Sequence, residues 1–350
     1  MGPAIEKIKE KCAGCFACYN VCPQNAINME LSPEGFYIPK LNETCTDCGL
    51  CEISCPVLSY PQLKRYPTPI TYASWSKDEK VRMKSSSGGV FSELAKTIIE
   101  KGGVVYGVIW DNNFFPKHER TTNEKTLEKM RGSKYVPSYV GDAYNKVVED
   151  LKNGKFVLFS GTPCQVAALN KIIEIKNVDN TKLFTVDIVC HGVPSLLVFQ
   201  KYLRYVSKGK IIENVSFRDK ETGWSKYQVK IRFEDGSFYT SKHYEDPFFI
   251  GFLQNLYLNT ICYECPFSKI PRQGDITLGD FWGAPKNLKN EKGVSIVLVN
   301  SKKGAKLLEQ VKRLELVEVP INIAVKENPR ITSGKLSKPE KREKIFLEQF

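Results

Sequence analysis

From residue 72 onward, two patterns of apolar residues alternate along the chain. One has the period of an amphipathic helix, and the other is the short continuous apolar run of a buried strand. Residues 90–100 place their apolar side chains on one helical face, and glycines 102 and 103 end that segment. Further helices are expected over residues 140–151 and 195–206. Strand-like runs lie at residues 104–110, 156–159 and 183–189. Helices that alternate with strands predict an α/β domain with a mostly parallel sheet.

A β-rich insertion interrupts this alternation. Tyr227, Val229, Ile231 and Phe233 occupy every second position, which is the spacing of a strand with one buried face. The Asp-Gly pair at 235–236 is typical of a hairpin turn. Two further strands are expected at residues 275–279 and 294–299.

The ends of the chain differ from this central part. Residues 1–60 are expected to form a small α+β unit rich in cysteine, and residues 61–71, with three prolines, read as a linker. The large α/β domain then spans residues 72–320. Residues 321–350 form a charged tail, for which we expect at most a partly ordered helix after Lys326.

The first 60 residues contain the spacing C-x2-C-x2-C-x3-C-P twice, which is the signature of a bacterial-type dicluster ferredoxin. In such modules the fourth cysteine of each motif ligates the cluster held by the other motif. One 4Fe-4S cluster is therefore assigned to Cys12, Cys15, Cys18 and Cys55. The second is assigned to Cys45, Cys48, Cys51 and Cys22. Zinc knuckles and disulfides fit this spacing poorly, because cysteine triplets with a trailing Cys-Pro are not zinc pairs. Residues 32–40, between the motifs, are expected to form a surface hairpin.

Charge and composition argue against a nucleic-acid-binding, membrane-spanning or secreted protein. The 51 lysines and arginines exceed the 39 aspartates and glutamates, for a formal net charge of +12. These charges are scattered, which favours anionic cofactors or acidic protein partners over nucleic acid. No segment approaches the roughly 20 apolar residues of a membrane span, and residues 1–11 lack the apolar core of a signal peptide. Together with cysteines in metal-binding rather than disulfide spacing, this predicts a cytoplasmic protein.

Four more cysteines lie in the large domain. Cys164 follows one predicted strand and Cys190 ends another, so both are expected at the sheet edge where ligands gather. Cys262 and Cys265 form a C-x-x-C pair. Four cysteines match the count for a third 4Fe-4S cluster, but a structural zinc or buried free thiols fit the spacing equally well.

Two segments suggest an anion site. Residues 85–89, Ser-Ser-Ser-Gly-Gly, precede the first long helix, where exposed backbone N–H groups and the helix dipole favour a phosphate. An ordinary serine N-cap is the alternative. Residues 131–135, Arg-Gly-Ser-Lys-Tyr, supply two cations around a glycine, or else a solvated basic turn. His118, His243 and Trp224 are better explained by packing than by ligand binding.

In this order, the motifs resemble those of the coenzyme F-420 hydrogenase/dehydrogenase beta-subunit family, with the ferredoxin module fused in front. The matching elements are residues 86–90, 131–135, 161–165, 190–192, Cys262-x-x-Cys265 and 275–281. The resemblance implies FAD as a cofactor and a cluster on Cys164, Cys190, Cys262 and Cys265. It also implies that two segments line the FAD site; their residues are Ser86, Ser87, Gly88, Gly89, Arg131, Gly132, Ser133, Lys134 and Tyr135.

The function expected from these features is that of a FAD-dependent iron–sulfur oxidoreductase. A flavin suits the junction between a two-electron substrate and one-electron clusters. The substrate is expected to be a small redox molecule or the deazaflavin coenzyme F-420, and the partner a ferredoxin or a larger complex. A non-enzymatic electron-transfer subunit is the alternative. No side chain in the sequence is identified as the catalytic acid or base.

Overall fold

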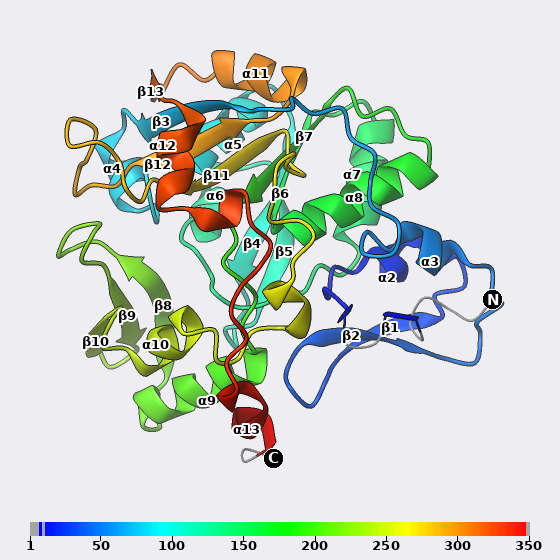
Figure 1. The fold of residues 1–350 in the computed structure, drawn as a ribbon, viewed down its shortest axis with the longest axis horizontal. Helices are drawn as coiled ribbons and strands as arrows, with labels where there is room; N and C mark the ends of the chain where they lie inside the picture. The colour runs from blue at the N-terminus through cyan, green and yellow to red at the C-terminus, as the bar shows by residue number, and fades with distance from the viewer. Residues whose placement is uncertain (1–6, 9–10, 348–350) are drawn as a thin grey trace.

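The computed structural model describes residues 7–8 and 11–347, so most of the N-terminal stretch considered above lies outside the described residues. The N-terminal module contains α2 (Ala17–Val21), β1 (Ile27–Leu31), β2 (Tyr37–Leu41) and α3 (Leu50–Ser54), with β1 and β2 antiparallel. Both short helices start after a left-handed residue, Phe16 (φ 65°) and Gly49 (φ 75°), at equivalent points of the two cysteine motifs. The module lies at one side of the molecule, drawn in blue in Figure 1.

An eight-stranded sheet of order β13-β3-β12-β11-β7-β6-β4-β5 forms the centre of the large domain. Its middle strands β11, β7, β6 and β4 are parallel, and antiparallel strands extend both margins. The strands are β3 (Ile70–Ser76), β4 (Val104–Trp110), β5 (Pro116–Thr121), β6 (Val157–Gly161), β7 (Leu183–Ile188), β11 (Ile276–Asp280), β12 (Ser295–Val299) and β13 (Leu314–Glu318). The α/β prediction is confirmed.

Helices cover both faces of this sheet. On one face, α5 (Val90–Glu100), α6 (Glu124–Met130) and α11 (Lys302–Glu309) pack in one apolar cluster with Val105. On the other, α7 (Ala143–Lys152) and α8 (Pro163–Ile175) pack against Val104 and Tyr106. The alternation along β4 thus sends neighbouring side chains into two separate cores. The short α4 (Glu79–Met83) follows β3.

The predicted insertion is a separate three-stranded antiparallel sheet of order β10-β9-β8. Its strands are β8 (Ile212–Asp219), β9 (Gln228–Phe233) and β10 (Phe238–Lys242). Helix α9 (Leu196–Ser207) precedes the sheet, and α10 (Pro247–Leu253) follows it. Val229, Ile231 and Phe233 are buried, as their alternation predicted, and Gly236 takes the left-handed conformation in the turn. The short 3-10 segment η2 (Thr260–Tyr263) follows.

The hairpin between the two cysteine motifs forms, but its tip is not a free surface. Ser195 Oγ donates a hydrogen bond to Glu34 O (2.6 Å), and Leu196 N donates to Gly35 O (3.1 Å). A Cβ at Gly35 would lie 2.7 Å from Leu197 N, so only glycine allows this approach. The extra residues of the hairpin therefore dock the module onto the start of α9.

The charged tail is also more ordered than expected. It forms α12 (Ile321–Lys326), the 3-10 turn η3 (Pro329–Ile331) and α13 (Lys341–Leu347), and it runs back across the molecule to end below the insertion (Figure 1). Arg330 and Arg342 are buried, and Cys265 N donates to Gly334 O (2.9 Å). The sequence predicts at most a partly ordered helix here, but both arginines donate hydrogen bonds to carbonyl or carboxylate groups inside the fold.

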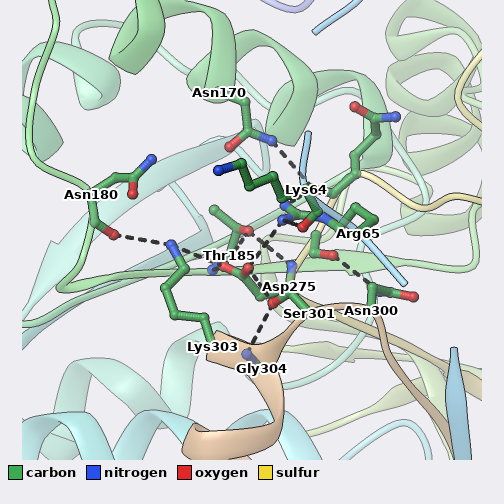
Figure 2. A network of polar contacts seen from close by, with 12 residues as sticks. Lys64, Arg65, Asn170, Asn180, Thr185, Asp275, Asn300, Ser301, Lys303 and Gly304 are labelled. Atoms are coloured by element: carbon green, nitrogen blue, oxygen red, sulfur yellow. Dashed lines mark hydrogen bonds and ion pairs between the residues drawn. The ribbon is translucent and has the colours of Figure 1, made fainter. Parts of the chain in front are cut away.

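The linker expected at residues 61–71 contains no helix or strand before β3 begins at Ile70, and it is anchored to the sheet. Arg65 Nη1 lies 3.3 Å from the buried carboxylate of Asp275, which also accepts hydrogen bonds from Thr185 and Ser301 (Figure 2). Burial opposes the charge of Asp275, but Lys303, Arg65 and the hydrogen bonds outweigh it and hold its pKa below the ordinary value.

None of the helices in the described part of the chain has the length and apolar character that a membrane span requires.

Candidate functional site

The eight N-terminal cysteines line two small neighbouring cavities. Four of them, Cys12, Cys15, Cys18 and Cys55, line one cavity, while Cys22, Cys45 and Cys48 line the other; Cys51 reaches both. Helices α2 and α3 end in extended residues at Cys22 and Cys55, which sends each fourth cysteine away from its own motif. The structure therefore places each fourth cysteine beside the triplet of the opposite motif, the grouping that the spacing predicts.

Burial governs the protonation of the thiols in the first cavity. Burial, with a smaller contribution from nearby Cys55, raises the pKa of the Cys12 thiol to about 11. Burial and the same neighbour hold the pKa of Cys15 well above its ordinary value. Four thiolates gathered in this space need compensating cations, which the irons of a cluster supply.

The other four cysteines meet at the edge of the sheet. Cys164 follows Thr162, the N-cap of α8, and Cys190 follows β7; Cys262 lies in η2, with Cys265 just beyond it. All four line one cavity. Burial, assisted by the neighbouring Cys265, raises the pKa of Cys164 to about 12 and that of Cys190 to about 11. Within the part of the chain that the structure describes, no group of three or more His, Cys, Asp or Glu side chains is placed to hold a single metal ion.

A larger cavity of about 310 Å³ opens beside this cysteine site. It lies over the carboxyl ends of β4, β6, β7 and β11, where ligands collect in open α/β sheets. The start of α5, the segment 130–138 and the ferredoxin residues Ala13 and Gly14 complete its wall.

Eight of the nine residues expected at the FAD site line this cavity; they are Ser86, Ser87, Gly89, Arg131, Gly132, Ser133, Lys134 and Tyr135. The two segments that carry them touch directly. Ser133 N and Ser133 Oγ both contact Ser86 Oγ, at 2.7 and 3.0 Å. Segments 47 residues apart in the chain thus form one rim of the cavity.

Gly88 does not line the cavity. Its N–H donates to Ser295 Oγ (2.9 Å), and a Cβ there would lie 2.3 Å from Ser74 O. The glycine is therefore required for close packing of the loop on β3 and β12. We correct the expectation that it clears a path for a phosphate.

The two cations are partly engaged by the protein. Arg131 donates from Nε to Ser92 Oγ (3.0 Å) and from Nη1 to Glu128 Oε1 (3.3 Å). Lys134 Nζ donates to the carbonyl oxygens of Lys129, Arg131 and Gly132, at 3.2 to 3.3 Å. Lys134 thus caps the C-terminal end of α6, while Arg131 links α6 to Ser92 of α5 at the cavity wall. Burial lowers the pKa of Lys134 to about 7.

One polar group at this cavity was missed by sequence reasoning. Asp280, at the end of β11, lines the cavity and accepts hydrogen bonds from Arg218 Nη1 (2.6 Å) and Trp224 Nε1 (2.9 Å). Arg218 Nη1 also donates to the Tyr135 hydroxyl (3.1 Å). These hydrogen bonds join the insertion to the sheet. In the sequence, the one indication of Asp280 as a site residue is its place in the 275–281 motif. Trp224 itself packs on Trp282, as expected.

Shared walls connect the four cavities. Ala13 lines the large cavity, the four-cysteine cavity and the cavity of Cys12, while Cys51 lines both ferredoxin cavities. Hydrogen bonds hold this junction together: Asn259 Nδ2 donates to Cys12 O (3.1 Å), and Tyr144 Oη donates to Cys15 O (2.8 Å).

His118 and His243 lie outside these sites. His118 is buried and stacked on Phe159, with ring centroids 5.2 Å apart, and His243 stacks on Tyr227 at 4.1 Å. Both are packing residues, as expected.

Three family models together match most of the chain. The model of the N-terminal part of the coenzyme F-420 hydrogenase/dehydrogenase beta subunit matches residues 71–144, and that of its C terminus matches residues 154–321. A 4Fe-4S dicluster domain model matches residues 11–58.

Individual relatives agree with this assignment. One subunit of the F(420)H(2) dehydrogenase of Methanosarcina mazei is 25% identical over 339 residues, which covers 91% of this chain and 88% of the relative. The beta subunit of the F-420-dependent formate dehydrogenase of Methanocaldococcus jannaschii is 22% identical over 279 residues, covering 78% and 68%. A chain in a structure of the F-420-reducing nickel–iron hydrogenase complex of Methanosarcina barkeri shares the fold, with a TM-score of 0.53 and 18% identity over 78% of this chain and 91% of that one.

Proposed function

The chain belongs to the coenzyme F-420 hydrogenase/dehydrogenase beta-subunit family and has a 4Fe-4S dicluster domain at its N-terminal end, and from this premise we propose that it is a FAD-dependent iron–sulfur oxidoreductase subunit. It passes electrons between a small organic redox substrate and a protein partner. The names of its relatives favour the deazaflavin F-420 as the substrate class.

The shared walls of the four cavities carry this proposal. Electrons move between redox centres only over short distances, and Ala13 lies at the junction of the large cavity, the four-cysteine cavity and the first ferredoxin cavity. Cys51 continues the series to the second ferredoxin cavity. This order supports a path from the large cavity to the surface, where Cys48 is exposed.

The donor sets fit three clusters. We assign four thiolates to each, because the cysteines gather in fours around single cavities, which is the number that a 4Fe-4S cluster needs. The ligands of the first are Cys12, Cys15, Cys18 and Cys55; of the second, Cys22, Cys45, Cys48 and Cys51; of the third, Cys164, Cys190, Cys262 and Cys265.

The large cavity fits a flavin dinucleotide in size and polarity. Its volume falls within the range of small-molecule sites, and the first N–H groups of α5, which have no partner within the helix, suit the pyrophosphate. Ser86 and Ser133 add hydroxyls and Arg131 adds a positive charge. Burial lowers the pKa of Lys134 to about 7, and a phosphate beside it would favour its charged form. When bound, FAD exchanges two electrons with an organic substrate and single electrons with clusters.

A stopped-flow experiment tests the proposed order. Wild-type protein and Cys164→Ser are mixed anaerobically with reduced F-420 while flavin and cluster absorbance are followed separately. We expect both signals to bleach in the wild type, and only the flavin signal to bleach in the variant. Dithionite is the control, since it should still reduce the ferredoxin clusters of the variant. Reduction of those clusters by F-420 at the wild-type rate in Cys164→Ser would overturn the path.

A further inference from the structure

Arg330 occupies an unusual position beside the four-cysteine cavity. It lines the cavity and is only 5% exposed. Its guanidinium donates from Nε to Cys190 O (3.1 Å), from Nη2 to Cys262 O (3.3 Å) and from Nη1 to Ser333 O (3.3 Å). Within residues 11–347, no carboxylate forms an ion pair with it.

A buried guanidinium without a counter-charge is costly, so its surroundings should contain an anion. Asp187, the carboxylate nearby, pairs with the neighbouring Arg272. Arg272 is 1% exposed, donates from Nη1 to Arg330 O (3.2 Å) and lies 3.4 Å from the carboxylate of Asp187. One charge of the arginine pair is therefore balanced by Asp187, and the other faces the cysteines.

Ser268 provides a second, independent observation. It is fully buried and lines the same cavity, and its hydroxyl has no hydrogen-bond partner among the residues that the structure describes. An unpartnered buried hydroxyl is destabilising unless a group inside the cavity accepts a hydrogen bond from it. A cluster sulfur is such an acceptor.

We infer that Arg330 and Ser268 tune the third cluster, Arg330 through its positive charge and Ser268 through a hydrogen bond to a cluster sulfur. The inference rests on the proposed cluster of Cys164, Cys190, Cys262 and Cys265. A 4Fe-4S centre with four thiolates is anionic, and one-electron reduction adds a further negative charge. Both residues therefore stabilise the reduced form and raise the reduction potential. This makes the cluster beside the large cavity a better electron acceptor.

Potentiometric titration followed by electron paramagnetic resonance tests this inference on the full chain. Cys262→Ser first identifies the third cluster, as the signal lost in that variant. Arg330→Gln should then lower the equilibrium constant for one-electron reduction of that cluster about tenfold, a shift of about 59 mV to more negative potential. Arg330→Lys keeps the charge and should remain close to the wild type. Ser268→Ala should shift the potential in the same direction as Arg330→Gln, by a smaller amount.

Lys335→Gln is the matched control, since it removes an exposed cation from the same segment and should leave the potential unchanged. Unchanged potentials in Arg330→Gln and Ser268→Ala would overturn the tuning role. If Arg330→Gln loses iron, Ser268→Ala alone decides, and an unchanged potential there counts against the inference. If Cys262→Ser loses neither a signal nor iron, the proposed third cluster has failed instead.

Discussion

The contact that docks the ferredoxin module leads to a quantitative prediction about Arg342. Its guanidinium forms two hydrogen bonds with the carboxylate of Glu34, at 3.1 and 2.6 Å, and its Nε donates to Leu258 O (3.0 Å). The arginine side chain is 3% exposed and that of Glu34 is 37% exposed. The tail thereby holds the tip of the hairpin against the start of α9.

The change Arg342→Gln removes both charged hydrogen bonds. Each such bond contributes about 1.5–3 kcal/mol in buried sites, but the exposure of Glu34 reduces the total through solvent screening. We expect docking to weaken by about 2 kcal/mol, so that the hairpin opens about 30-fold more often.

Hydrogen exchange at the Leu196 amide reports this opening directly. Leu196 is the first residue of α9, so its N–H has no partner within the helix and is protected by Gly35 O. Its exchange should accelerate about 30-fold in Arg342→Gln, while amides of β7 keep their wild-type rates. Lys338→Gln is the control, because it breaks only an exposed pair with Glu343. An unchanged Leu196 rate, or equal acceleration throughout the chain, would refute the reasoning.

Three further changes have defined outcomes. Cys22→Ser should abolish the paramagnetic signal of the second ferredoxin cluster and spare the first; loss of the first instead would contradict the exchanged ligands. Gly88→Ala should destabilise the fold by about 1–3 kcal/mol in thermal unfolding, because its Cβ would approach Ser74 O to 2.3 Å; wild-type stability would contradict this packing role. Asp275→Asn should lower the unfolding free energy by about 3–5 kcal/mol at neutral pH, since Arg65 loses its counter-charge. Because the carboxyl pKa is depressed in the fold, that loss should shrink as denaturant titrations are repeated below about pH 4, and a pH-independent loss would contradict it.

The spacing of residues along the chain was sufficient to predict those features of the fold and the site that depend on a few neighbouring residues. The cysteine motifs predict which thiols gather, because short helices and their extended ends are determined within a few residues. The alternation of apolar residues likewise predicted the central strands and the insertion, because burial of one face follows from period two along a strand. The main helices and the parallel centre of the sheet were also predicted.

Long-range contacts account for what sequence reasoning missed. Gly88 appeared to be a phosphate-loop glycine because its neighbours in space, on β3 and β12, are invisible in the local sequence. Arg330 and Arg342 belong to a tail expected to be charged and at most partly ordered, since a charge count does not show which cations have buried partners. The hairpin tip, too, is explained only by its partner α9. Each error concerns a residue whose role depends on a segment far away in the chain.

The composition of the purified protein tests the central claim most directly. The protein is isolated without oxygen, and iron and released flavin are counted in the same preparation. The account predicts about one FAD and about twelve irons per chain, the content of three 4Fe-4S clusters. About eight irons and no FAD would contradict the account.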